Sequence, residues 1–248
     1  MVMTRREATR AATVQEIKDA ALALMRAQGT VDVKLSDVAR EMRMSAPGLY
    51  RYFDGREALL AALIVDSLTA LAERVEAARD AVPADDPGGR FLAVCRAYRA
   101  WATEDREGFT LVFGPAIAGL DRLHQAPLPV GAPPPDKAAI LRALDALRSL
   151  ARDADQLGVR RPLPITVLPP GMAETLCGGE GDDAATELAM IYCWASLHGF
   201  ITLEVNGNLG WHEPELREPM FLGLVRVQAR LLGLPDPAAG WPEETPTP

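Results

Sequence analysis

Four polar side chains with related chemistry lie close together near the start of the chain: Tyr50, Arg51, Tyr52 and Arg56. They belong to the stretch SAPGLYRYFDGREALL, residues 45–60. Tyrosine hydroxyls and guanidinium groups donate hydrogen bonds, and the guanidinium also carries a positive charge, so both groups suit phosphate oxygens. The stretch therefore indicates a surface that contacts phosphate groups.

The distribution of charge limits where such contacts can occur. The chain of 248 residues has a formal net charge of −8, but residues 1–60 contain ten Lys or Arg against eight Asp or Glu. The remainder is strongly acidic. An acidic body repels nucleic acid, whereas a mildly basic head can touch it locally.

Helical segments must position these side chains. Apolar residues recur at three- and four-residue intervals over 13–28, and Gly29 is placed to end that helix as a C-terminal cap. Ser36 and Ser45 are good N-caps for two short helices, and Pro47 is tolerated in the first turn of the second. The four expected helices cover 13–28, 36–42, 45–53 and 56–81. The last is expected to bury one apolar stripe: Leu59, Leu60, Leu63, Ile64, Leu68 and Leu71.

Two short helices joined by a tight turn form a helix-turn-helix, whose second helix enters the DNA major groove with its N-terminal residues. Ala46 and Gly48 remove side-chain bulk from that end, so the backbone can approach the duplex. The alternative is a helical hairpin whose aromatic residues belong to a core. We assign Leu49 and Phe53 to the core, and Tyr50, on another face, to DNA.

The rest of the chain is also predicted to be helical, because strand-like runs of Val, Ile and Thr are scarce. Further helices are expected over 91–105, 109–120 and 136–157. Segment 183–205 is apolar on almost every side, which predicts one face in the core and another against a second subunit. A stripe over 219–232 is its expected companion: Phe221, Leu224, Val225, Gln228 and Leu232.

Other sequence features bear on the location of the protein. The stretch 188–203 has no Asp, Glu, Lys or Arg and is 16 residues long, shorter than the ~20 residues of a membrane span, so a buried helix and no membrane contact are expected. The three cysteines form no CxxC pair and are expected to be core residues or bystanders in a reducing cytoplasm. No apolar segment follows Arg5 and Arg6, so no signal peptide is expected.

The first 65 residues resemble the DNA-binding domain of the TetR family of transcriptional regulators. The similar segments are IKDAALALMRAQG, LSDVAREM, MSAPGLYRYF and GREALLAAL, in the family's order and spacing. The resemblance implies an all-α protein with an N-terminal three-helix helix-turn-helix head, joined by a long helix to a helical-bundle domain for ligand binding and dimerisation. It also implies a homodimer that represses from a palindromic double-stranded DNA operator and leaves it when a small molecule binds.

Domain boundaries and DNA contacts follow from this resemblance. The head is expected over 1–58, the ligand-binding and dimerisation domain over 59–234 with its connecting helix at 56–81, and a Pro-rich tail over 235–248. Two positions depart from the family pattern: Arg43 replaces a glycine usual in the turn, and Arg56 replaces a lysine. The expected DNA-binding residues are Lys34, Ser36, Arg43, Ser45, Ala46, Pro47, Gly48, Tyr50, Arg51, Tyr52 and Arg56.

The segment CWASLHGF resembles a Trp-to-His-Gly signature found in the C-terminal region of one branch of the family, through Trp194, His198 and Gly199. Trp194 and His198 are four residues apart and share a helical face. They could line an apolar cavity for a small apolar or amphipathic molecule, or they could simply be packing residues of a core. The expected ligand-binding residues are Tyr98, Trp101, Phe109, Phe113, Met190, Trp194 and His198.

Two other interpretations stay open at the level of sequence. A DNA-binding dimer could be controlled by a protein partner without any small-molecule pocket. A helical enzyme is the remote alternative, because the sequence shows no Ser-His-Asp motif, phosphate loop, metal pair at helical spacing or dinucleotide fingerprint. No cofactor and no metal site are expected.

Overall fold

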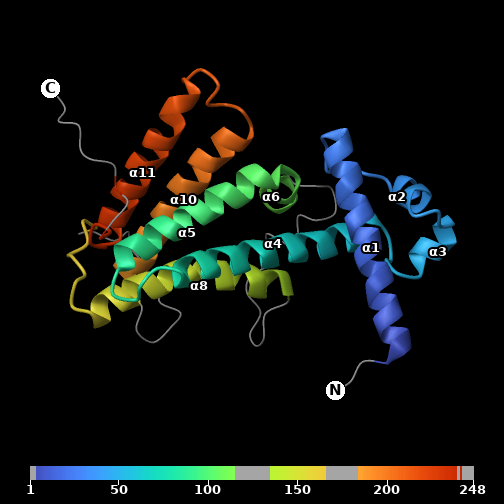
Figure 1. Ribbon diagram of the computed structural model, residues 1–248, viewed down its shortest axis with the longest axis horizontal. Helices are drawn as coiled ribbons and strands as arrows, with labels where there is room; N and C mark the ends of the chain where they lie inside the picture. Colours follow the sequence, from blue (N-terminus) through green and yellow to red (C-terminus); the bar gives the residue numbers. More distant parts are fainter. Residues whose placement is uncertain (1–3, 115–134, 166–183, 239–240, 242–248) are drawn as a thin grey trace. The chain divides into compact units, whose positions relative to one another are not determined.

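The computed structural model describes residues 4–114, 135–165, 184–238 and 241 (Figure 1). Every regular element in these ranges is helical, which confirms the predicted all-α fold. The chain divides into two compact units: unit 1 contains residues 1–70 and 105–140, and unit 2 contains residues 71–104 and 141–248. The division falls inside one helix, α4 (Arg56–Asp80), so that helix contributes to both units.

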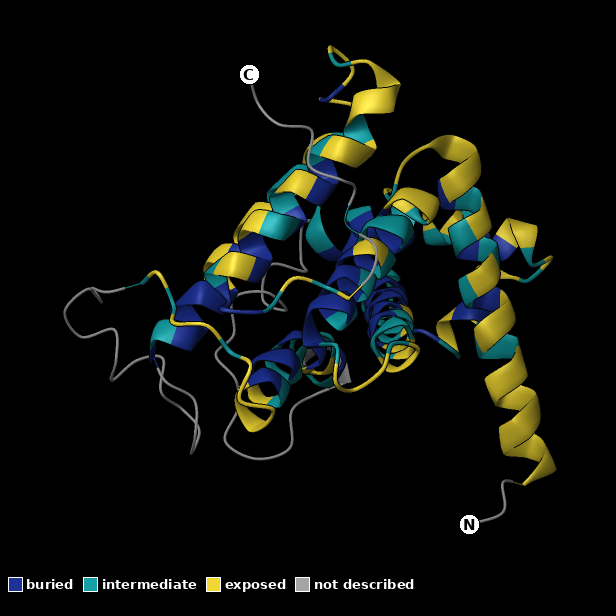
Figure 2. Ribbon diagram, turned by 60° about the vertical axis from the view of Figure 1, so that its left-hand side comes forward, coloured by how far each residue is buried: buried dark blue, intermediate teal, exposed yellow. Residues whose placement is uncertain are grey.

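Unit 1 begins with α1 (Arg5–Gln28), which starts eight residues before the predicted position. A capping box explains the earlier start, because the Thr4 hydroxyl accepts from the Glu7 backbone N–H and the Glu7 carboxylate accepts from the Thr4 N–H. Gly29 caps the other end with φ of 62°, as predicted. Residues 4–12 are exposed, and Figure 2 shows this end of α1 in yellow.

The two short helices of unit 1 are α2 (Leu35–Glu41) and α3 (Ala46–Tyr50). Ser36 was expected to cap α2, but the helix starts one residue earlier, with Lys34 at the N-cap and no side-chain capping bond. Ser45 caps α3 as predicted. The expectation that α3 reaches Phe53 was wrong: the Tyr52 N–H bonds to the Leu49 carbonyl at 2.9 Å, a three-residue spacing that tightens and ends the helix.

The core of unit 1 is formed by one face of each helix. α1 buries Ile17, Ala21 and Met25, and α2 packs against both α1 and α3. Leu49 and Phe53 are buried, as predicted. α6 (Arg106–Phe113), which the sequence placed later, at 109–120, packs on α1. The predicted stripe of α4, which runs through both units, is buried throughout: Leu59, Leu60, Leu63, Ile64, Leu68 and Leu71.

Unit 2 contains the end of α4, α5 (Pro87–Glu104), most of α8 (Pro135–Gln156), α10 (Ala184–Val205) and α11 (Arg217–Leu231), which follows a short 3₁₀ turn at Pro214–Leu216. α10 packs against α5 and α11. The start of α5, predicted at Phe91, lies four residues earlier because Pro87 occupies the first turn and the Asp86 carboxylate accepts from the Gly89 N–H at 2.8 Å. Cys95 and Cys193 are buried free thiols; Cys177 lies outside the described residues.

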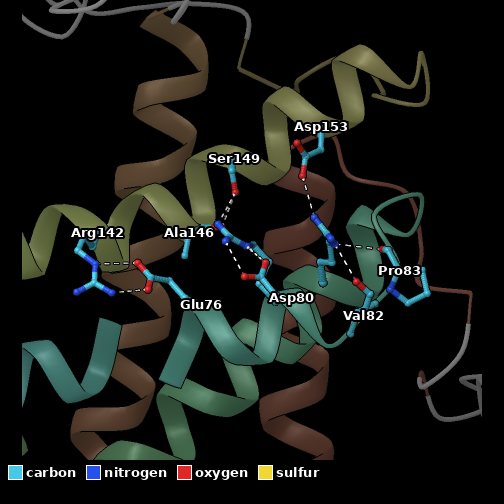
Figure 3. Close-up of polar contacts among 10 residues, drawn as sticks. Glu76, Asp80, Val82, Pro83, Arg142, Ala146, Ser149 and Asp153 are labelled. Carbon is cyan, nitrogen blue, oxygen red and sulfur yellow. Dashed lines mark hydrogen bonds and ion pairs between the residues drawn. The ribbon is translucent and has the colours of Figure 1, made fainter. Parts of the chain in front are cut away.

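Charged side chains join α4 to α8 within unit 2 (Figure 3). Arg142 on α8 forms two hydrogen bonds to the Glu76 carboxylate, at 3.0 and 2.5 Å. Arg79 on α4 donates to the Ser149 hydroxyl at 3.2 Å. Arg90 on α5 donates to the Asp153 carboxylate on α8 and to the carbonyls of Val82 and Pro83, in the loop between α4 and α5. These contacts fix the end of α4 in unit 2.

α10 is 22 residues long, and its length and composition alone would allow it to cross a membrane. One such helix is weak evidence for a span, because the core helix of a folded protein meets the same criterion; 39% of its most apolar window is buried. α10 also has an exposed apolar face, with Ile191, Tyr192 and Leu203 on it. The expectation that the stripe of α11 faces a second subunit was wrong, because Phe221, Val225, Gln228 and Leu232 are buried within unit 2. On the same helix, Val227 is 59% exposed.

Candidate functional site

The turn between α2 and α3 has an unusual backbone. Arg43 has φ of 53°, in the left-handed region that favours glycine. The Arg43 N–H bonds to the Arg40 carbonyl and the Met44 N–H to the Ala39 carbonyl, at 3.0 and 2.8 Å. These are the two bonds of a Schellman motif, in which the left-handed position is usually glycine. The turn thus keeps the geometry that a glycine would give and presents an exposed guanidinium there instead.

α3 presents small residues at its first turn and an aromatic residue at its end. The Ser45 hydroxyl accepts from the Gly48 N–H at 3.2 Å, which fixes the start of the helix. A Cβ at Gly48 would lie 3.2 Å from that hydroxyl, so a larger residue would crowd the cap. Ala46 and Pro47 are exposed, as are Lys34 and Ser36 near the start of α2. Leu49 points into the core, whereas Tyr50 is 56% exposed.

The cations of residues 4–56, all in unit 1, form two groups. Lys18, Arg26, Arg40 and Arg56 pair with carboxylates. A second group has no carboxylate within 4 Å among the described residues: Arg5, Arg6, Arg10, Lys34, Arg43 and Arg51. In the described part of unit 2, by contrast, every arginine except Arg217 and Arg230 has such a partner. The second group in unit 1 therefore retains its charge for an external anion.

Two predicted DNA-binding side chains are engaged inside unit 1. Arg56 donates to the Val33 carbonyl at 3.0 Å and to the Asp32 carboxylate at 2.7 Å, so it fastens the loop between α1 and α2 to the start of α4. Tyr52 is half-buried, with the Arg10 guanidinium 5.2 Å from the centre of its ring. These interactions give both residues a structural role within unit 1. Their contact with DNA stays a prediction.

The sequence pattern did not single out the arginines near the start of α1, because the apolar periodicity of this helix begins at Thr13. Arg10 donates to the Arg51 carbonyl at 3.1 Å and so joins α1 to the end of α3. The signal that could have found them is the capping box, in which Thr4 is followed three residues later by Glu7.

Four of the predicted ligand-binding side chains form a cluster of rings in unit 2: Tyr98 and Trp101 on α5, and Trp194 and His198 on α10. A fifth, Met190, also lies on α10. The Tyr98 hydroxyl lies 2.7 Å from Nδ1 of His198, and the ring of Trp194 stacks on His198 with 5.2 Å between centres. Trp101 stacks beside Tyr98 at 6.2 Å. Met190 is buried on the same helix as His198.

The remaining two predicted ligand-binding side chains, Phe109 and Phe113, belong to unit 1, where their ring centres are 5.4 Å apart. In the unit 2 cluster, burial lowers the pKa of His198 and raises the pKa of Tyr98. Both groups are therefore uncharged near neutral pH, and their contact is a neutral hydrogen bond in an aromatic surrounding. Tyr98 and Trp101 are buried in this cluster, whereas Trp194 is 37% exposed.

The fold and the head define the class of protein. A short helix with small residues at its exposed leading end, preceded by a second short helix and accompanied by exposed cations, is a helix-turn-helix DNA-binding unit. Residues 10–63 match the family described as "Bacterial regulatory proteins, tetR family", and residues 91–227 match "Tetracyclin repressor-like, C-terminal domain". The chain belongs to the TetR family of transcriptional regulators, which are not enzymes.

Individual relatives agree with this assignment. The chain is 30% identical over 190 residues to the HTH-type transcriptional regulators Rv1816 of Mycobacterium tuberculosis and Mb1846 of Mycobacterium bovis, which covers 73% of this chain and 76% of each relative. Among solved structures, regulatory protein SCO4313 superposes with a TM-score of 0.67 at 24% identity, over 91% of this chain and 98% of that one. The TetR regulator PfmR of Thermus thermophilus shares the fold with a TM-score of 0.52 at 18% identity, over 85% and 97%.

Proposed function

We propose that this regulator is a repressor that binds a palindromic operator as a homodimer and is released by a small apolar or amphipathic molecule. Its place of action is the cytoplasm, where a DNA-binding regulator meets its operator. The proposed DNA-binding domain covers 1–58. The domain for ligand binding and dimerisation covers 59–234, with 56–81 as the connecting helix and 235–248 as a tail.

In the head, α3 would enter the major groove with Ala46, Pro47 and Gly48 leading, because these residues leave the backbone closest to the bases. Tyr50 and the exposed cations Arg43 and Arg51 would hold phosphates. Phosphate contacts of this kind fix the register of the protein on the duplex, while base contacts supply the specificity.

The exposed apolar face of α10 supports the homodimer. Ile191, Tyr192 and Leu203 lie on it, and Val227 on α11 is also exposed. A water-exposed apolar face on a helix that is otherwise apolar marks a surface for a partner, and a second copy of the chain offers the same face under two-fold symmetry. Two subunits engage two half-sites, whose recognition helices must be about 34–36 Å apart or a multiple of that spacing.

The observation that carries the effector proposal is the neutral Tyr98–His198 hydrogen bond, flanked by the rings of Trp101 and Trp194. An aromatic effector with a hydroxyl could stack on these rings and exchange hydrogen bonds with the pair. The solved structure of RolR in complex with its ligand resorcinol shares the fold, with a TM-score of 0.51 at 17% identity. Because α4 belongs to both units, it is the element through which an effector would change the spacing of the recognition helices.

Calorimetry tests the switch. A thermal-shift screen against phenols and lipophilic metabolites supplies a ligand, which is then titrated into the protein with and without operator DNA. Operator and effector must weaken each other's binding by the same factor, typically about 5–150-fold. Tyr98→Phe keeps the ring, removes the hydroxyl and should weaken binding of a hydroxylated ligand. Equal ligand affinity with and without operator would contradict the switch, and a screen without hits would favour control by a protein partner.

A further inference from the structure

A hollow of about 540 Å³ lies on unit 1, between the start of α1 and the end of α3. Its lining residues are Arg5, Arg6, Thr9, Arg10, Arg51 and Tyr52. The hollow is outside the set of residues expected to read the major groove, except for Arg51 and Tyr52 where the two regions meet. Arg5, Arg6 and Thr9 also precede residues 10–63, the segment that matches the family.

Interactions within unit 1 give this hollow its form. Arg10 donates to the Arg51 carbonyl at 3.1 Å and lies over the ring of Tyr52, so the wall on α1 and the wall at the end of α3 are held together. The Thr9 hydroxyl donates to the Arg5 carbonyl at 3.0 Å and so remains able to accept a hydrogen bond. The capping box at Thr4 holds the start of α1 in helical form, which fixes the backbone of Arg5 and Arg6.

The charge of the hollow is one-sided. Its four arginines have no carboxylate within 4 Å among the described residues. The nearby acidic residue of α1, Glu7, does not line the hollow. Its carboxylate accepts hydrogen bonds from Thr4, which lower the pKa of the carboxyl group. Four guanidinium groups around one hollow repel one another, and an anion placed among them relieves that repulsion.

We infer that this arginine-lined hollow binds a phosphate of the DNA backbone beside the half-site that α3 reads. The inference rests on the proposed operator binding and extends the protein's contact along the duplex. The lining arginines are all exposed, which suits a long polyanion better than a small enclosed anion. Arg51 follows α3 directly, so a duplex that receives α3 in its groove has backbone phosphates near the hollow.

The variant Arg5→Gln with Arg6→Gln tests the inference, because glutamine keeps the helix and removes two charges from the hollow. Arg26→Gln with Arg106→Gln is the charge-matched control, since both residues are exposed in unit 1, outside the hollow, and the net charge changes equally. Because this control also removes the Arg26–Asp105 ion pair, the Tm of both variants is measured alongside DNA binding. The probe is a duplex selected from a random pool by the wild-type protein. It is used at full length and trimmed to the two half-sites, and affinity is measured by anisotropy between about 50 and 200 mM NaCl.

Each phosphate that the protein neutralises adds about 0.9 to the slope of log K against log salt, so a fourfold rise in salt costs about 3.5-fold in affinity per phosphate. We expect the hollow variant to have a slope less steep by about 0.9 for each phosphate that it no longer binds. Trimming the duplex should lower its affinity for the wild type and for the control, but should not change its affinity for the hollow variant.

Three outcomes would overturn the inference. One is that the hollow variant keeps the wild-type slope and the same sensitivity to trimming. Another is that inorganic phosphate binds the hollow in calorimetry while the two protein variants bind DNA equally well, since the site would then serve a free anion. A wild-type protein that binds no duplex would instead remove the proposed function on which the inference depends.

Discussion

Arg43 offers a sharp test, because its two properties predict opposite effects of one substitution. Its φ of 53° penalises any residue with a Cβ, while its exposed guanidinium has no carboxylate partner among the described residues. The left-handed conformation costs such a residue about 1–2 kcal/mol, which glycine avoids. A glycine offsets about 0.5–1 kcal/mol of this advantage, because it makes the unfolded chain more flexible and so loses more conformational entropy on folding.

Arg43→Gly should therefore stabilise the fold by about 0.5–1 kcal/mol, which raises Tm by about 1–4 °C for a chain of this size. The same change should weaken operator binding and reduce the salt slope by about 0.9 for each phosphate that Arg43 holds. Arg43→Lys keeps both the charge and the strained φ, so Tm and slope should stay near wild type. Arg43→Asn tolerates the turn and should lie between glycine and arginine in stability while removing the charge.

The assays are scanning calorimetry for Tm and fluorescence anisotropy for DNA binding. Arg40→Gly is the control, because Arg40 is exposed within α2 and a glycine there should lower stability by about 1 kcal/mol. A folded Arg43→Gly protein that melts at or below the wild-type Tm would refute the argument from backbone strain. An unchanged salt slope would refute the phosphate contact of Arg43.

Three further predictions concern other parts of the molecule. Arg56→Ala should destabilise unit 1 by about 1 kcal/mol in urea titrations, because the Val33 carbonyl and Asp32 lose their donor; stability equal to wild type would show that the clamp contributes nothing. Burial lowers the pKa of His198, so the unfolded chain takes up the proton first as pH falls below about 6.5, and stability should drop between that pH and the lower folded pKa. His198→Gln should flatten this part of the pH dependence, and an identical profile in both proteins would count against it. Ala195→Arg, on the exposed part of α10, should give a folded monomer with much weaker operator binding in light scattering and anisotropy, and a variant that stays dimeric would contradict this interface.

The sequence predicted best what depends on neighbouring residues. Gly29 and Ser45 were found as caps because capping needs only the residues of one turn, and the buried side of α4 followed from three- and four-residue spacing. The first turns of α1 were missed because residues 5–12 have no apolar stripe; only the capping box indicates them.

Interactions between distant residues were beyond the pattern. The bond from Arg56 to Asp32 joins residues 24 positions apart, so no local spacing reveals that this arginine has a partner inside the unit. For α11, periodicity predicted an apolar stripe through Val225 but did not say what covers it, and the structure buries it within unit 2. The partners Tyr98 and His198, 100 positions apart, were both predicted because their residue types suit a pocket, whereas their hydrogen bond needed the fold.

The most direct test of operator binding by a homodimer is selection of duplex DNA from a random pool by the full-length protein, followed by sequencing. The account predicts enrichment of one sequence with two-fold symmetry, whose half-site centres are separated by about one helical turn or a multiple of it. Removal of one half-site should then reduce affinity far more than a change in the flanking sequence. A pool without enrichment, or an enriched site without symmetry that binds one subunit, would contradict the account.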